Sequence, residues 1–337
     1  MNFIKRFCQR YFIDAMSSMA LGLFASLIIG TIIGQFAKIS ALSFLTPLSD
    51  ALSASSPVIG AAIGVAIATG LKEKPLVVFT AAATGAIGYT YGGPVGAYLS
   101  AVVGSEIASL VVSKTKLDII ITPLASILTG GLLGVYVGPY INEFMKLLKT
   151  LIENATAYAP IPMGIVISVV VGMALTAPIS SAALCMMIGI DGIAAGAAAV
   201  GCCCQMVGFA VTCYRDNDIG GSLSVGVGTS MLQFHNILRH PQIWLAPTLA
   251  AAVLGPISTA LLKMTNTAMG AGMGTAGLVG QFGAYEAMAP AVGSTTALIE
   301  IAVMHFVLPA VLTLMFDYCF RRLDWVKPGY MKLRTEA

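Results

Sequence analysis

Long stretches without a charged residue constrain this chain more than any other feature. A helix needs about 20 apolar residues to cross the hydrocarbon of a bilayer, and only 10% of this sequence is charged, against about 25% in soluble domains. Runs of 18 or more residues without Asp, Glu, Lys or Arg include 15–37, 51–71, 75–105, 119–142, 154–190, 192–214, 241–262 and 264–285. They predict an all-α polytopic membrane protein, a single integral membrane domain over 1–337, with about 10–12 transmembrane or re-entrant helices.

Basic residues flank both ends of the apolar part. Lys5, Arg6 and Arg10 precede the first run, and the segment 321–337 is a basic tail. Because Lys and Arg concentrate on the cytoplasmic side of membrane proteins, we expect both termini in the cytoplasm and an even number of crossings. We read these charges as membrane anchors and expect no nucleic acid partner. The first run is too long for a signal-peptide core, so we expect an uncleaved span.

The chain carries a second copy of one of its own segments. Gly220 to Gly255 aligns without a gap on Gly96 to Gly131, at an offset of 124 positions and with eight identities in 36. We expect two repeats, 13–150 and 155–265, followed by an unrepeated Gly-rich segment and final span over 266–320. Five crossings in the first copy would make the repeats inverted, a layout shared by many secondary transporters.

Two further expectations come from this layout. Glu143 to Glu153 alternates apolar and charged residues, and we expect a surface helix that joins the repeats. Gly220 to Ile237 is counted as a span of the second copy.

Polar side chains within the apolar runs are candidate ligand contacts, because their burial in lipid is costly. Gln205, Gln233, His235 and Asn236 lie in the second copy, near Asp216–Asp218. On a helix, Gln233 and Asn236 are three residues apart and share a face, whereas His235 points elsewhere. The alternative is that these amides only hold helices together.

Two short apolar segments open at prolines, Pro57 and Pro178. Each is expected to be a half-helix whose free N–H groups suit an anionic or hydroxyl-rich ligand. Ser180 and Ser181 follow the second proline and are candidate contacts; simple helix capping is the alternative.

The segment 266–281, NTAMGAGMGTAGLVGQ, contains a G-x-G-x-x-G pattern. We reject a dinucleotide site, because no strand precedes it. The segment is either a re-entrant loop that carries Asn266 and Gln281 towards a ligand or a helix packed through its glycines.

Residue patterns for catalysis are missing from the sequence. There is no Ser/His/Asp grouping, phosphate loop or metal-ligand spacing, and the seven cysteines form no C-x-x-C pair. We therefore expect no enzyme activity, no catalytic residue, no metal and no cofactor. Glu106, Glu286 and Glu300 lie in or beside apolar runs and are candidates for proton coupling.

Three stretches carry a family resemblance: TAPISSAAL (176–184), GGSLSVGVGTSMLQFHNILRHP (220–241) and NTAMGAGMGTAGLVGQFGA (266–284). Through them the chain resembles the stand-alone enzyme IIC-like membrane components of bacterial phosphotransferase-system sugar permeases. The resemblance implies a multi-pass permease of the bacterial plasma membrane, commonly a homodimer, that moves one helical unit against another. It also implies a separate soluble phosphotransferase component as a partner, since we expect both ends of the chain to be too short for a fused one.

The prediction is a permease that moves a small solute, sugar-like or a small anionic or organic molecule, by alternating access at a site between the repeats. The predicted ligand-binding residues are Ser180, Ser181, Gln205, Gln233, His235, Asn236, Asn266 and Gln281. A membrane ligand sensor that binds a small molecule without phosphotransfer is the alternative, and a scaffold protein is a third class.

Overall fold

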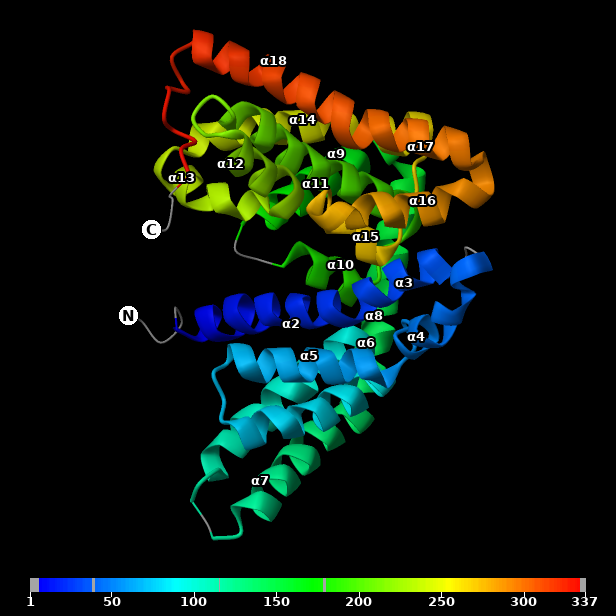
Figure 1. Ribbon diagram of the computed structural model, residues 1–337, viewed down its shortest axis with the longest axis vertical. Coiled ribbons are helices and arrows are strands. Elements are labelled where there is room, and N and C mark those ends of the chain that lie inside the picture. The colour runs from blue at the N-terminus through cyan, green and yellow to red at the C-terminus, as the bar shows by residue number, and fades with distance from the viewer. Residues whose placement is uncertain (1–5, 38–39, 115, 178–179, 334–337) are drawn as a thin grey trace. The chain divides into compact units, whose positions relative to one another are not determined.

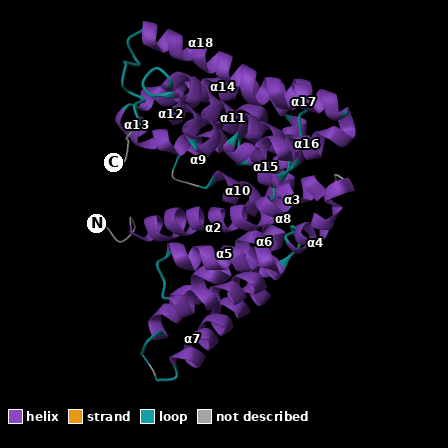
Figure 2. Cartoon of the chain, in the orientation of Figure 1, coloured by secondary structure: helices purple, strands orange, loops and turns teal. Residues whose placement is uncertain are grey.

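A computed structural model describes residues 6–37, 40–114, 116–177 and 180–333. Within these residues every named element is a helix, and an isolated bridge between Gly192 and Asn266 stands outside them (Figures 1 and 2). Contacts divide the chain into two compact units, Met1–Leu148 and Lys149–Ala337. We describe each unit by itself; elements labelled η are 3₁₀ or π turns.

The first unit is built from helices of largely apolar sequence. A first long helical stretch over residues 8–37 is followed by two short helices over residues 40–51 and then by the pair α5 and α6. The unit ends in a further helical stretch, residues 118–158, which extends past Leu148. The elements are η1 (Cys8–Ala15), α2 (Met16–Leu23), η2 (Phe24–Ile28), α3 (Ile29–Ala37), η3 (Ser40–Leu45), α4 (Thr46–Ala51), α5 (Pro57–Gly70), α6 (Pro75–Val111), α7 (Asp118–Ser126), η4 (Ile127–Gly131) and α8 (Leu132–Tyr158).

Helix α6 is bent by the sequence Gly92-Gly93-Pro94. Gly93 has φ +58° and ψ −154°, a backbone conformation that residues with a Cβ rarely adopt. The bend brings the two arms of α6 so close that a Cβ on Gly96 would clash with the carbonyl of Gly88. Figure 1 shows α6 beside α5 in the lower part of the view.

Glycines on α8 and η4 pack against α6 at backbone distance. A Cβ on Gly134 would lie 2.7 Å from Ser100 Oγ, and one on Gly138 would lie 3.1 Å from the backbone N of Gly92. Small residues four apart let two helices approach closely where lipid gives no hydrophobic drive for association. The glycines of the Ile119–Tyr140 region therefore set the spacing of these helices.

The second unit surrounds one buried helix, α11. Seventeen of the 22 residues of α11 are buried, which is typical of a helix that is apolar on all sides. Helices α9, α14 and α18 pack around it. The elements are α9 (Pro160–Thr176), α10 (Ser181–Ile188), α11 (Gly192–Cys213), α12 (Ile219–Leu223), η5 (Ser224–Gly228), η6 (Ser230–Gln233), α13 (Phe234–Arg239), η7 (Pro241–Trp244), α14 (Leu245–Pro256), η8 (Ile257–Leu262), α15 (Ala268–Ala271), η9 (Ala276–Leu278), α16 (Val279–Val292), α17 (Ser294–Ala302), η10 (Val303–Val307) and α18 (Leu308–Arg322).

Two expectations about elements are wrong. Glu143 to Glu153 is not a separate surface helix: α8 continues through it to Tyr158, and Pro139 inside α8 does not end the helix. Gly220 to Ile237 is not one span. Thr229 is extended, with φ −159° and ψ 135°, and its hydroxyl accepts a hydrogen bond from the N–H of Met231, which caps a new turn.

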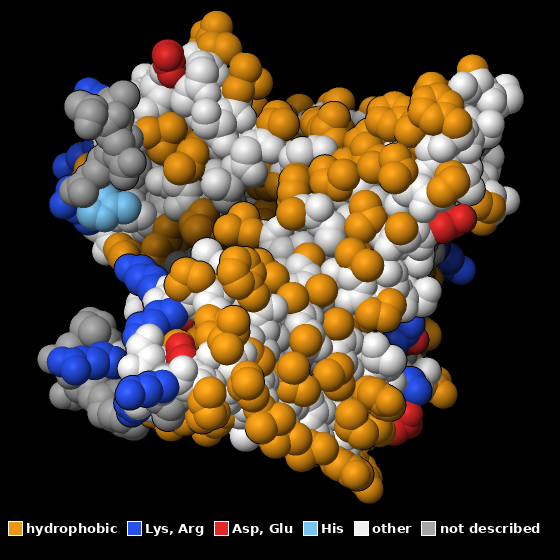
Figure 3. All heavy atoms as spheres, turned by 60° about the horizontal axis from the view of Figure 1, so that its bottom comes forward, with side chains coloured by type: hydrophobic (Ala, Val, Ile, Leu, Met, Phe, Trp, Pro, Cys, Tyr) orange, Lys and Arg blue, Asp and Glu red, His pale blue; other side chains and the backbone are white. Residues whose placement is uncertain are grey.

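The prediction of an all-α polytopic membrane protein is confirmed. Among the described residues six helices are long and apolar enough to cross a membrane: Cys8–Gly34, Pro75–Val111, Asp118–Tyr158, Gly192–Cys213, Pro241–Leu262 and Ser294–Arg322. Large apolar side chains are exposed on them, and hydrophobic side chains cover much of the face in Figure 3, while charged side chains lie towards its margins. Such a surface fits contact with lipid.

Candidate functional site

Gln205 on α11 is the centre of a buried hydrogen-bond network. Its Oε1 accepts from Trp244 Nε1 at 3.0 Å and from Thr176 Oγ1 at 3.3 Å, and its Nε2 donates to Thr248 Oγ1 at 3.2 Å. The Thr176 hydroxyl also bonds Ser230 Oγ at 2.9 Å. The network thus joins α9, α11, η6, η7 and α14, and its buried polar groups are amides, hydroxyls and an indole N–H.

The interruption at Thr229 lies beside this network. Ser230 is fully buried and follows Thr229 directly, so the extended residue places the Ser230 hydroxyl against Thr176. On the other side of the break, the carbonyl of Gly226 accepts a hydrogen bond from the Thr275 hydroxyl. The break therefore connects the Gln205 network to the Gly-rich segment.

The Gly-rich segment 266–281 is broken and not a continuous helix, and it is largely buried except at Gly277 and Leu278. It contains the single turn α15 and the short η9, and Gly274, Gly277 and Leu278 all have φ between +53° and +60°. Gly274 is needed for space as well, since a Cβ there would lie 2.8 Å from the backbone of Cys202 on α11. Of the two predicted arrangements, the non-helical one describes this backbone.

Asn266 and Gln281, at the ends of this segment, both have internal partners. Asn266 is 1% exposed; its Nδ2 donates to the Gly280 carbonyl at 3.0 Å, and its Oδ1 accepts from the N–H of Thr267. Gln281 Nε2 lies 3.1 Å from His305 Nδ1, and Gln281 Oε1 and His305 Nε2 are buried without a hydrogen-bond partner. Asn266 fixes the backbone of the segment, while Gln281 keeps a free acceptor.

Ser180 and Ser181 open the short helix α10. The Ser180 side chain accepts from the N–H of Ala183, which is the capping role, and the Ser181 hydroxyl donates to the carbonyl of Gly272 at 2.6 Å. The predicted break at Pro178 lies outside the described residues. In the first copy, the Ser56 side chain likewise accepts from Val58 N at the start of α5.

Gln233 and Asn236 share a face, as the spacing predicts, and Asn236 Nδ2 donates to Gln233 Oε1 at 2.8 Å. Both amides also bind the chain segment that follows α18: Gln233 Nε2 donates to the Met331 carbonyl and Asn236 Nδ2 to the Lys332 carbonyl. His235 is exposed and lines a separate open pocket. The three residues therefore lie apart from the contacts of Gln205.

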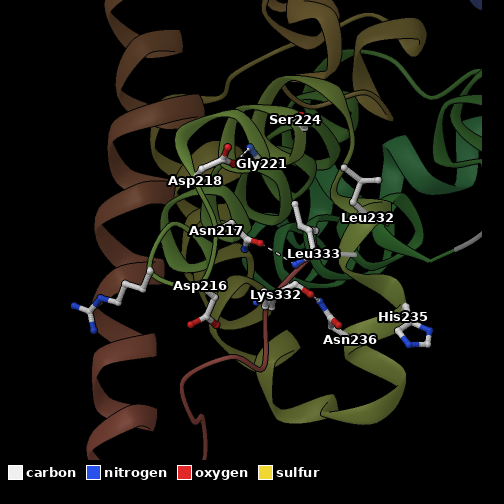
Figure 4. Close-up of a pocket in the computed structure, with 11 residues that line it drawn as sticks. Asp216, Asn217, Asp218, Gly221, Ser224, Leu232, His235, Asn236, Lys332 and Leu333 are labelled. Atoms are coloured by element: carbon white, nitrogen blue, oxygen red, sulfur yellow. Dashed lines mark hydrogen bonds between the residues drawn. The ribbon is translucent and has the colours of Figure 1, made fainter. Parts of the chain in front are cut away.

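That pocket has a volume of about 1130 Å³ and lies at the end of α11 (Figure 4). Its lining is polar and carries both signs of charge. The lining residues are Arg215, Asp216, Asn217, Asp218, Gly221, Ser224, Leu232, His235, Asn236, Lys332 and Leu333.

Several charged residues outside the network form local ion pairs. Arg10 lies 2.8 Å from both Glu73 and Glu106, so Glu106 has a partner in its own unit. Burial raises the pKa of Glu73 above its ordinary value, and the charge of Arg10 opposes part of that shift. For Asp191, burial also acts to raise the pKa, but hydrogen bonds with Lys149 and Glu153 outweigh it and lower the pKa.

Sequence reasoning missed Trp244, Thr176, Ser230 and Thr248 as partners of Gln205. Hydroxyls are frequent in apolar helices, so nothing singled these out. A tryptophan is rare here, with two in the chain, and an indole N–H inside an apolar run needs an acceptor. That requirement is the one signal that points to Trp244.

The fold and the polar network define a multi-pass membrane protein with a neutral hydrogen-bonding centre. A family model described as "Phosphotransferase system, EIIC" matches residues 13–333. The chain belongs to this family, and the predicted resemblance is confirmed. No curated protein and no solved structure matches the chain.

Membership makes the chain a membrane sugar permease component of the phosphotransferase system. Domains of this family are the transport component and not the catalytic phosphotransferase domains. Membership in this family implies a sugar as the class of substrate.

Proposed function

We propose that the chain moves a sugar by alternating access and that the second unit holds the sugar next to Gln205. The carrying observation is that two interrupted segments contact α11 beside one network, the break at Thr229 and the segment 266–281, and that the start of α10 is hydrogen-bonded to the second of them. Irregular backbone at membrane depth persists only where it is buried in protein or lines a cavity, and transporters build their sites from such broken helices.

The chemistry of the network fits a neutral, hydroxyl-rich ligand. Gln205 offers an amide that both donates and accepts, Thr176 and Ser230 offer hydroxyls, and Trp244 offers an aromatic face and an N–H donor. The hydrogen-bond partners Thr176, Thr248 and Trp244 of Gln205 carry no formal charge. An anion would leave its charge unpaired there, at a cost of several kcal/mol.

In the present arrangement the hydroxyls and amides bind one another. Gln205, Thr176 and Ser230 are each 0% exposed, so a sugar must replace these bonds when the interrupted segments separate. We take this arrangement as the closed state of the site. Gln281 Oε1, which is buried without a partner, is a further group that a sugar hydroxyl can satisfy. Ser181 and Asn266 hold the neighbouring backbone and shape the site.

The proposal includes the topology that the sequence predicts. Two inverted repeats with both termini in the cytoplasm would give the two faces of an alternating-access cycle, and the family resemblance favours a homodimer. Single cysteines placed near residue 94 and near residue 218 are expected to label from opposite sides of the membrane. Labelling of both from the same side would exclude the inverted arrangement.

Uptake by proteoliposomes tests the site. Purified protein is reconstituted and offered a panel of labelled sugars, with and without the soluble phosphotransferase proteins of its host. Thr176→Val removes one hydroxyl from the network with little change of shape and is expected to weaken sugar binding and uptake about 10-fold, the value of one hydrogen bond.

Ser168→Ala is the matched control. Ser168 lies on the same helix α9, is also 0% exposed, and donates to the Ala251 carbonyl away from Gln205. Sugar uptake by the Ser168→Ala variant is expected to stay within about twofold of uptake by the unchanged protein. Sugar binding without flux would favour the sensor alternative, and neither binding nor flux for any sugar would refute the transport proposal. Equal uptake by the two variants would place the site elsewhere.

A further inference from the structure

The segment Leu323–Leu333, which follows α18 and which we call the strap, is held by side chains that bind its backbone. The Asp216 carboxylate accepts from the N–H of Gly329 at 2.9 Å and of Met331 at 3.1 Å. Asn217 accepts from the N–H of Leu333 at 2.8 Å and donates to the Met331 carbonyl at 2.9 Å. Figure 4 shows the Asn217–Leu333 contact in the wall of the open pocket.

Two of the predicted ligand-binding residues also bind the backbone of the strap. Gln233 donates to the Met331 carbonyl and Asn236 to the Lys332 carbonyl. The backbone of Met331 is thereby bonded at both its N–H and its carbonyl. Four polar side chains, those of Asp216, Asn217, Gln233 and Asn236, thus bind the backbone of the strap. These contacts do not involve the side chains of the strap.

Apolar side chains of the strap enter the core of the second unit. Val326 is 3% and Met331 0% exposed, and they pack in one cluster with Phe209, Cys213 and Ile243. By contrast, the near end of the strap is exposed, with Leu323 at 61% and Trp325 at 53%.

The strap also holds the segment that carries Trp244. Tyr330 stacks on His240, with ring centroids 3.7 Å apart and ring planes at 2°. His240 immediately precedes η7, and Trp244 at the end of η7 packs against the same apolar cluster as Met331. Trp244 in turn donates its N–H to Gln205. A continuous path of contacts therefore runs from the strap to the centre of the polar network.

Two residues of the strap have a positive φ. Asp324 has φ +57° and Gly329 has φ +86°, and residues 323–333 form turns and no helix. Surface turns open at lower free energy than core helices. The open pocket beside the strap gives it room to leave.

We propose that the strap is a detachable gate over the Gln205 network: when it is docked it excludes water from Trp244 and Gln205, and when it leaves it opens this side of the unit. The gating role rests on the proposed sugar site, whereas docking and release can be measured without any sugar. An alternating-access transporter closes its site on one side of the membrane at a time. A gate at one end of the site would provide one of these two closures.

Thiol labelling on the full chain reports the docked state. Cys213 is buried under the strap and Cys8 is exposed, so Cys8 serves as an internal reference. Asp216→Asn removes the charge that binds two N–H groups of the strap. We expect the labelling of Cys213 by N-ethylmaleimide, relative to Cys8, to rise at least about 10-fold, because hydrogen bonds to a charged group are among the stronger ones.

Asp324→Asn is the matched control, since it makes the same chemical change on the strap at an exposed residue, and Asn also adopts positive φ. Its labelling ratio is expected to stay within about twofold. Met331→Ser releases the strap by a different route, through its apolar anchor, and is expected to give the same labelling as Asp216→Asn.

Quenching of Trp244 by acrylamide, in a Trp325→Phe background that leaves Trp244 as the single tryptophan, tests the gate itself. It is expected to increase in both release variants, and sugar uptake by them is expected to change at least about fivefold. Faster Cys213 labelling with unchanged Trp244 quenching would overturn the gate and leave the sugar site standing. Unchanged labelling in both release variants would show that the strap is a fixed part of the core. If the unchanged protein transports no sugar, the proposed function fails, while labelling and quenching still decide whether the strap opens.

Discussion

Replacement of Gln205 by leucine tests whether the polar network is a single coupled unit. The change removes three hydrogen bonds and leaves the indole N–H of Trp244 without its acceptor, while Thr176 keeps Ser230. Hydrogen bonds between helices in membrane proteins contribute about 0.6 kcal/mol on average and about 1.7 kcal/mol at most. A buried donor left without an acceptor costs about 1–3 kcal/mol. We expect Gln205→Leu to lower the unfolding free energy by about 2–4 kcal/mol.

A double-mutant cycle with Trp244→Phe isolates the central bond. Alone, Trp244→Phe removes the donor and leaves Gln205 Oε1 with Thr176, so we expect a loss of about 1–2 kcal/mol. Replacing both partners by apolar groups removes the unpaired donor, so the double variant should be more stable than the sum of the two changes predicts. The expected coupling is about 1 kcal/mol.

Unfolding in mixed micelles with increasing dodecyl sulfate, followed by far-ultraviolet circular dichroism, gives the four free energies. This signal does not depend on Trp244. Coupling below about 0.3 kcal/mol, meaning that the two losses simply add, would refute the reasoning that the network acts as a unit. The same variants in sugar uptake then separate a loss of binding from a loss of fold.

Two further predictions concern the first unit. Gly134→Ala is expected to lower the unfolding free energy by about 1–3 kcal/mol, because the new Cβ would lie 2.7 Å from Ser100 Oγ. Gly131→Ala is the control and should be neutral or stabilising, because its Cβ would have ordinary contacts at 3.4 Å or more. Equal effects of the two changes on the unfolding free energy would exclude backbone packing as the cause. Because the raised pKa of Glu73 means that the folded protein binds this proton more tightly, its contribution to the unfolding free energy falls as pH rises from the ordinary glutamate pKa through the raised one. Arg10→Gln leaves the Glu73 charge unpaired, so the loss of unfolding free energy should be larger at about pH 8 than at about pH 5, by about 1–2 kcal/mol. Unfolding measured at both pH values checks this. A loss of unfolding free energy that does not depend on pH would contradict the assignment.

The contacts of Gln233 and Asn236 show where sequence reasoning reaches its limit. Their spacing correctly predicts a shared face, because residues three apart on a helix are neighbours. Their second partners, the carbonyls of Met331 and Lys332, are almost 100 positions away and belong to a segment with no marked pattern. Backbone carbonyls carry no sequence signal, so the strap could not be predicted.

The break within the repeated segment is a second case. Gly96 to Val111 continues as helix in α6, whereas its counterpart after Gly220 ends at Thr229. The aligned sequences are similar in composition, and a Gly-rich stretch permits both outcomes. The contacts of Ser230 with Thr176 and of Gly226 with Thr275 accompany the interruption, and both are tertiary.

The sequence by itself determined the membrane class, the helical content, the apolar segments and the family, because these follow from local composition and from the cost of placing charge and free backbone in lipid. It also marked the glycine-rich segments where helices pack closely or break. Only the tertiary structure decided which polar groups meet: Gln205 with Trp244, Asn266 with Gly280, and Asp216 with the strap. Hydrogen bonds between distant residues depend on how helices dock, and that docking depends on the shapes of many side chains at once.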